Sequence, residues 1–167
     1  MSFNISKIEN LIRDYLLEEG ILKEKLSNVD FDFGFVFTYP PGLNRQNISI
    51  YKPKKSNTIF ISIRYQISEE KARILNSLKQ DQKNQLFYDL RRYFLIKEVY
   101  FSIDIQKMII EIHELIYPQK EKIVSKNSVF KKFQKVFYCF IYSNLIVEEY
   151  CLGKQRAADD FNTTLFS

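Results

Sequence analysis

The strongest constraint on the fold is residues 29–39, in which an apolar or aromatic side chain stands at every odd position. Successive side chains of a β-strand point to opposite faces, so the odd residues share one face. A helix would scatter the same rings around its circumference. The stretch therefore predicts a strand whose buried face carries Val29, Phe31, Phe33, Phe35, Phe37 and Tyr39, and whose other face carries Asp30, Asp32, Gly34 and Thr38.

Two more alternating stretches follow closely. Residues 47–52 predict a short second strand, and residues 59–67 predict a third with Ile or Tyr at every odd position. Residues 40–42, Pro-Pro-Gly, predict a turn after the first strand, because Pro and Gly suit the second and third positions of a type II turn. Residues 53–57 form a basic turn after the second strand. These short connections predict an antiparallel meander.

The remaining elements follow from the spacing of apolar residues. In chain order the spacing predicts a helix over 4–19, a polar connection over 23–28, a helical stretch over 69–97 interrupted near 79–85, strands over 99–105 and 108–117, and a long helix from Asn127 or Ser128 to Gly153. The order α-βββ-α(α)-ββ-α predicts an α+β fold. We expect a five-stranded antiparallel sheet with the helices packed on its aromatic face.

Length and composition predict one domain over residues 1–153, with a polar, flexible tail over 154–167. The chain has 15 Phe and 11 Tyr but no Trp, which indicates a ring-rich core with Tyr left over for contact surfaces. Cys139 and Cys151 are about 18 Å apart along one predicted helix, too far for a disulfide. Free thiols, and the lack of a signal sequence or apolar span, predict a cytoplasmic protein without membrane contact.

The net charge of +5 is concentrated near the C-terminus. Residues 120–156 hold eight Lys or Arg and three Glu, so the rest of the chain is nearly balanced. A solvated lysine face is the ordinary interpretation, and binding of a phosphate backbone is the sharper one. The candidate anion-binding residues are Lys120, Lys122, Lys126, Lys131, Lys132 and Lys135.

Catalytic motifs give little support for an enzyme. The four glycines are far apart, and neither a phosphate-binding loop nor a G-x-S-x-G elbow is present. Glu111 and His113 share one strand face and could begin a metal site with Asp30 and Asp32. A polar, half-exposed sheet face carries such residues by default, so we assign no catalytic residue, metal or cofactor. A metal-dependent enzyme is the third alternative for function.

The outer face of the sheet is the main candidate for binding. It carries Tyr51, Phe60, Arg64 and Tyr100, and residue types of this kind are enriched at protein interfaces. Rings beside a cation could also stack nucleic-acid bases. Asp30, Asp32, Asp104 and Glu111 on the same face favour a polypeptide partner, beginning with a second copy in a homodimer. A nucleic-acid-binding protein that uses these rings and the segment Lys120–Lys135 is the second alternative.

Several segments carry a family resemblance: residues 33–35 and 39–46, residues 50–55, Asp89-Leu90-Arg91-Arg92-Tyr93-Phe94-Leu95 and Cys139-Phe140-Ile141-Tyr142-Ser143-Asn144. Over residues 1–155 the chain resembles an uncharacterised, mainly archaeal family of unknown function. The order of elements is also similar to that of type III secretion chaperones, which are small dimeric α+β proteins that bind partner polypeptides. Neither resemblance implies an activity or a role for a particular residue.

Overall fold

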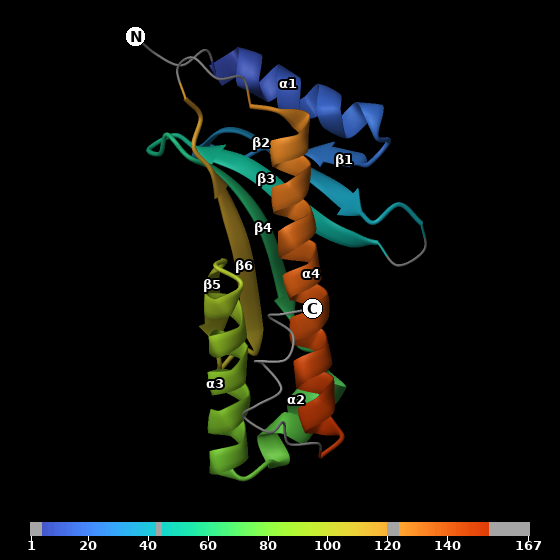
Figure 1. Cartoon of the computed structure of the whole chain (residues 1–167), viewed down its shortest axis with the longest axis vertical. Coiled ribbons are helices and arrows are strands. Elements are labelled where there is room, and N and C mark those ends of the chain that lie inside the picture. Colours follow the sequence, from blue (N-terminus) through green and yellow to red (C-terminus); the bar gives the residue numbers. More distant parts are fainter. Residues whose placement is uncertain (1–4, 43–44, 120–123, 154–167) are drawn as a thin grey trace.

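The computed structural model describes residues 5–42, 45–119 and 124–153. Within these ranges the chain forms an antiparallel sheet of six strands in the order β1-β2-β3-β4-β6-β5, with four helices (Figure 1). The elements are α1 (Ile5–Glu18), β1 (Leu22–Lys25), β2 (Phe31–Tyr39), β3 (Gln46–Pro53), β4 (Ile59–Gln66), α2 (Glu69–Ser77), α3 (Gln80–Ile96), β5 (Tyr100–Asp104), β6 (Ile109–Ile116) and α4 (Lys126–Cys151). The α+β class and the antiparallel sheet are confirmed.

The predicted number of five strands is wrong, because β1 lies where a polar connection was expected. Leu22 pairs with Phe37 and Lys25 pairs with Phe35, so β1 extends the sheet beyond β2. Leu22 is half-buried, and the other three residues of this strand are exposed. A short, charged edge strand lacks the apolar alternation by which strands are recognised, and its charges discourage further pairing.

The buried face of β2 is also shorter than predicted. Val29 precedes the strand and is 83% exposed. The register shifts between Phe31 and Phe33, which is the mark of a β-bulge, and a bulge turns the preceding side chain to the other face. Phe33, Phe35 and Phe37 remain buried as predicted, whereas Phe31 stacks on Tyr51, on the outer face.

Helix α4 crosses the inner face of the sheet and provides most of the ring contacts in the core (Figure 1). Phe133 meets Phe37 edge-to-face at 5.0 Å between ring centroids, and Phe140 meets Tyr65 in the same way at 4.9 Å. Rings of this size bury large apolar areas, so these contacts provide much of the hydrophobic stabilisation. Helix α3 packs beside α4 and against β5, and α1 packs against β1 and β2.

Serine side chains cap the first turns of α2 and α4. The Ser125 hydroxyl accepts a hydrogen bond from the amide of Ser128 at 3.1 Å, so α4 begins before the expected Asn127 or Ser128. The predicted cap of α2 at Ser68 is confirmed, with an accepted bond from the Lys71 amide at 3.4 Å. The interruption of the helical stretch falls at Leu78 and Lys79, at the start of the polar run 79–85 that was predicted to bend or interrupt it.

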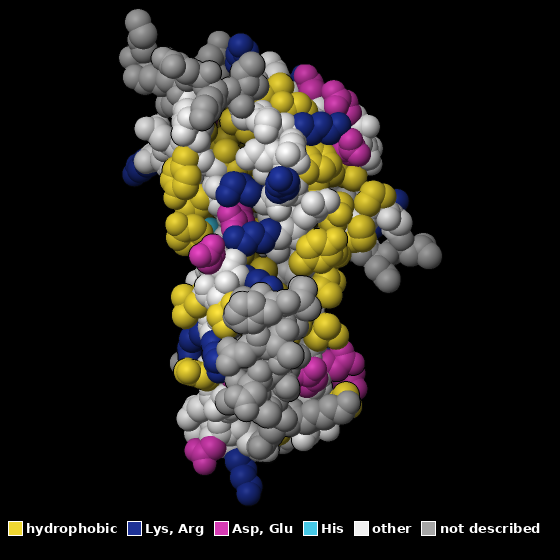
Figure 2. All heavy atoms as spheres, in the orientation of Figure 1, with side chains coloured by type: hydrophobic (Ala, Val, Ile, Leu, Met, Phe, Trp, Pro, Cys, Tyr) yellow, Lys and Arg dark blue, Asp and Glu magenta, His cyan; other side chains and the backbone are white. Residues whose placement is uncertain are grey.

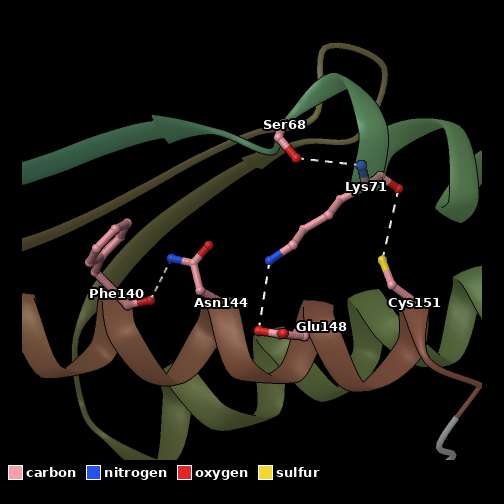
Figure 3. A network of polar contacts seen from close by, with 6 residues as sticks. All are labelled: Ser68, Lys71, Phe140, Asn144, Glu148 and Cys151. Atoms are coloured by element: carbon pink, nitrogen blue, oxygen red, sulfur yellow. Dashed lines mark hydrogen bonds and ion pairs between the residues drawn. The ribbon is translucent and has the colours of Figure 1, made fainter.

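Polar contacts hold α2 against the last turns of α4 (Figure 3). The Lys71 ammonium lies 3.8 Å from the Glu148 carboxylate, and the Cys151 thiol donates to the Lys71 carbonyl oxygen at 3.9 Å. On the same side of α4, the Asn144 amide donates to the Phe140 carbonyl oxygen at 3.0 Å. Both cysteines are free, as predicted, with Cys139 buried and Cys151 half-buried.

None of the helices in the described ranges combines the length and the apolarity that a membrane crossing requires. The predicted tail over 154–167 lies outside the described residues. The division of the chain at residue 153 therefore stays a prediction.

Candidate binding face of the sheet

The outer face of the sheet, opposite the helices, carries a continuous row of rings. Phe31 stacks on Tyr51 at 4.6 Å, and Tyr51 stacks on Phe60 at 5.5 Å. His113 follows at 5.7 Å from Phe60, and Tyr100 stacks on His113 at 5.4 Å with an interplanar angle of 7°. We call Phe31, Tyr51, Phe60, His113 and Tyr100 the ring row. It crosses β2, β3, β4, β6 and β5 in turn.

Strand register explains why these rings meet. Tyr51 is directly opposite Phe60, and Tyr100 is directly opposite His113. Phe60 is opposite Leu115 in the register, so its contact with His113 is a diagonal one, which is within reach of aromatic side chains. The bulge brings Phe31 to the same face. Each ring of the row thus contacts its neighbours because of antiparallel pairing.

Gly34 makes room for one end of the ring row. It pairs with Tyr51, and a β-carbon at this position would lie 3.0 Å from the Leu26 β-carbon and 3.3 Å from the Tyr51 β-carbon. Leu26 is tied to this place by its amide, which donates to the Gly34 carbonyl oxygen at 2.8 Å. Glycine is therefore required here for close approach rather than for an unusual backbone angle.

His113 is a packed ring between Phe60 and Tyr100 in the row. Burial lowers its pKa from the ordinary value, and the nearby Glu111 and Glu114 offset this only in part. Its Nδ1 is buried and has no hydrogen-bond partner among the described residues. A ring between Phe60 and Tyr100 with a lowered pKa serves as an aromatic surface more than as a charged group.

The predicted metal alternative gains no support from this geometry. Glu111 accepts a hydrogen bond from the Ser62 hydroxyl at 3.1 Å, and Asp32 forms an ion pair with Lys52. In residues 5–42, 45–119 and 124–153, no group of three or more His, Cys, Asp or Glu is placed to hold an ion. These carboxylates instead serve structural hydrogen bonds and an ion pair.

Charge on the outer face is mixed. Arg64 on β4 is opposite Glu111 on β6, and it is exposed. Asp104 lies at the end of β5 and accepts a hydrogen bond from the Lys107 amide at 3.0 Å. At the β5 edge Tyr100 is 52% exposed, and a hydrogen bond with Tyr100 raises the pKa of Tyr117. The predicted residues Tyr51, Phe60, Arg64 and Tyr100 therefore share one face.

Four of the predicted anion-binding lysines, Lys126, Lys131, Lys132 and Lys135, are described, and they lie on the helix-covered side of the sheet. Figure 2 shows lysine and arginine side chains gathered over the first half of α4. Lys126 pairs with Glu19 at 2.7 Å, and Lys132 and Lys135 pair with Glu114 at 2.8 and 2.7 Å. Lys131 is exposed, whereas Lys120 and Lys122 lie outside the described residues. The structure thus places the described lysines and the outer rings on opposite sides of the sheet.

The sequence did not point to two members of this surface, although it placed His113 on the outer face beside the rings. Phe31 was assigned to the buried face. Tyr117 was considered only as the end of a strand. The continuation of odd-numbered outer residues past His113 could have indicated Tyr117, but no pattern in the sequence signals the bulge that moves Phe31.

The fold and the open sheet face define an α+β protein with a one-sided antiparallel sheet. The family model described as "Uncharacterized conserved protein (DUF2299)" matches residues 8–147, and the chain belongs to this family. The predicted relationship to an uncharacterised family is therefore confirmed. No curated protein matches the chain.

A solved structure shares the fold. It is the crystal structure of an uncharacterized protein from Methanothermobacter thermautotrophicus, with a TM-score of 0.76 and 20% sequence identity. The match covers 86% of this chain and 98% of the other. The expected similarity to type III secretion chaperones has no counterpart in this match and stays a prediction.

Proposed function

We propose that the protein binds another polypeptide through the outer sheet face, and that its first partner is a second copy of the same chain. The ring row carries this proposal, because it crosses five strands on the side opposite the helices. Stacked rings that are partly open to solvent still have apolar area to bury, and a partner surface can bury it.

Charge favours a second copy. Arg64 and Glu111 are directly opposite each other on the neighbouring strands β4 and β6, so the face carries a cation and an anion side by side. In a two-fold dimer the same patch meets itself, and Arg64 of one copy can meet Glu111 of the other. A phosphate backbone would instead meet the carboxylates of Glu111 and Asp104 and be repelled.

The size of the face suits a dimer of ordinary area. Five strands that are five to nine residues long, with about 3.4 Å per residue and a spacing of about 4.8 Å, outline a surface of roughly 600 Å² before side-chain relief is added. A stable interface buries about 800 Å² on each partner. Rings that project from the sheet account for much of the difference.

Sedimentation velocity over a wide range of protein concentration tests the proposal. We expect the wild type to dimerise, and Tyr100→Asp to weaken the dimer at least about tenfold, because an interface ring that a partner buries can contribute about 2 kcal/mol. Tyr88→Asp on α3 is the matched control, since Tyr88 is exposed to a similar extent, 57%, away from the outer face. A wild-type monomer at high micromolar concentration, or equal weakening by both substitutions, would contradict the proposal.

Nucleic acid remains the alternative partner and has its own measurement. The ion pairs of Lys126, Lys132 and Lys135 leave Lys131 as the exposed cation of the described set. We therefore expect only weak, salt-sensitive binding of single-stranded and duplex oligonucleotides. Micromolar binding that persists at physiological salt and is lost in Lys131→Glu would favour nucleic acid over a polypeptide.

A further inference from the structure

A pocket of about 600 Å³ lies between α3 and α4, on the helix side of the sheet and away from the ring row. Tyr93 and Tyr142 line it as a stacked pair, with ring centroids 4.4 Å apart, and Ile141 forms an apolar wall. Ligand pockets commonly have volumes of about 300–1,000 Å³ and mostly apolar linings. This pocket therefore has the size and surface of a small-molecule site.

The inner part of the pocket is uncharged at neutral pH. Tyr93 is almost fully buried, and burial raises the pKa of its hydroxyl. Burial likewise raises the pKa of the neighbouring Cys139 thiol. Both groups keep their protons, so a bound ring would meet neutral aromatic and apolar surfaces.

The rim of the pocket is positive. Lys97, Lys131 and Lys135 line it, and none of the described residues that line it carries a carboxylate. Lys135 is held by Glu114 at 2.7 Å and by the Glu98 carbonyl oxygen at 3.1 Å. Lys97 and Lys131 are exposed, and neither forms an ion pair with another residue of the described ranges. The mouth of the apolar pocket therefore carries Lys131 and Lys97, whose ammonium lies 6.0 Å from the centre of the Tyr93 ring.

We propose that this pocket binds a small molecule with a ring-bearing apolar body and one acidic group. The body would lie against Tyr93, Tyr142 and Ile141, while the acidic group would meet Lys97 and Lys131. An apolar wall supplies affinity, and the cations select for a negative charge. The site is independent of the proposed dimer face, which lies on the other side of the sheet.

Calorimetric titration with 2-naphthoate and its neutral counterpart 2-naphthalenemethanol tests the charge preference. We expect the wild type to bind the carboxylate at least about tenfold more tightly than the alcohol. The double variant Lys97→Gln/Lys131→Gln should lose that preference. The control Lys54→Gln/Lys55→Gln removes the same charge from an exposed turn and should keep it. Equal affinity for both probes, or equal loss in both double variants, would overturn the proposal.

A second pair of variants tests the location. Ile141→Trp adds bulk to the pocket wall, and Leu145→Trp adds the same bulk one turn further along α4, at a residue exposed to a similar extent, 48% against 42%. We expect Ile141→Trp to weaken 2-naphthoate binding at least about tenfold and Leu145→Trp to leave it unchanged. No saturable binding to the wild type at millimolar probe, or no loss in Ile141→Trp, would refute the site. Sedimentation of the Ile141→Trp variant reports separately on the dimer.

Discussion

Both faces of the sheet carry aromatic side chains, but the rings have different surroundings on the two faces. On the inner face Phe33, Phe35 and Phe37 are buried under helices, and each is surrounded by core side chains. On the outer face the rings stack on one another along the sheet, and Tyr100 stays 52% exposed. The number of aromatic residues on a face therefore does not by itself identify the core. What distinguishes the faces is whether a helix covers the ring.

The largest difference between the two faces is expected when the same charge is placed on each of them. Phe35→Asp puts a carboxylate where no water reaches, and it should cost about 4 kcal/mol or more, enough to prevent folding. Tyr100→Asp should change the free energy of unfolding by less than about 1 kcal/mol. Soluble yield and thermal unfolding by circular dichroism check both. Wild-type melting of Phe35→Asp would show that the faces are wrongly assigned.

Crowding at Gly34 should have the next largest effect. Gly34→Ala would place a β-carbon against those of Leu26 and Tyr51, which cannot swing away, and we expect a cost of about 1–3 kcal/mol. Ser49→Ala on β3 is the control, with a change of less than about 0.5 kcal/mol. Urea unfolding measures both, and an unchanged midpoint for Gly34→Ala would contradict the close packing of Leu26.

The Glu114 ion pairs on the inner face give a smaller, pH-dependent effect. Burial pushes the pKa of Glu114 up, but hydrogen bonds from Lys132 and Lys135 outweigh it and hold the pKa below 4.5. The stability that Glu114 adds is therefore present above about pH 4.5 and is lost as the pH falls through its folded pKa.

Glu114→Gln should cost about 1–2 kcal/mol at pH 7, because both lysines lose their charged partner but can still reach water. The difference from wild type should shrink below pH 4.5. Glu18→Gln is the control, since Lys126 keeps Glu19. Unfolding curves at several pH values measure the free energy of unfolding of each protein. A difference between Glu114→Gln and the wild type that does not change with pH would contradict the ion pairs.

His113 should give the smallest effect. Folding disfavours the charged form of His113, whereas it favours the charged form of Glu114. Its folded pKa lies below 6.5, so the unfolded chain binds a proton more readily, and stability falls as the pH drops below 6.5. His113→Phe keeps a ring in the row and removes the titration. Below pH 6.5 wild type should lose stability relative to this variant. Parallel pH profiles for the two proteins would show that His113 is not desolvated.

Sequence patterns predicted the inner face better than the outer one, for a physical reason. Burial of Ile59, Ile61 and Ile63 under α4 imposes a period of two that the sequence displays directly. Edge strand β1 and the bulge before Phe33 leave no such period. For this reason β1 was not predicted, and Phe31 was assigned to the wrong face. The pairing of Lys132 and Lys135 with Glu114, and the α3–α4 pocket, depend on tertiary packing that spacing along one element does not encode.

The most direct test of self-association through the outer face is charge exchange between Arg64 and Glu111. Arg64→Glu and Glu111→Arg should each weaken the dimer, because each brings like charges together across a two-fold interface. When the two single variants are mixed, opposite charges meet again at both contacts. Sedimentation velocity of the mixture should therefore show dimer restored. If the mixture stays as dissociated as either variant alone, the outer face does not pair with itself.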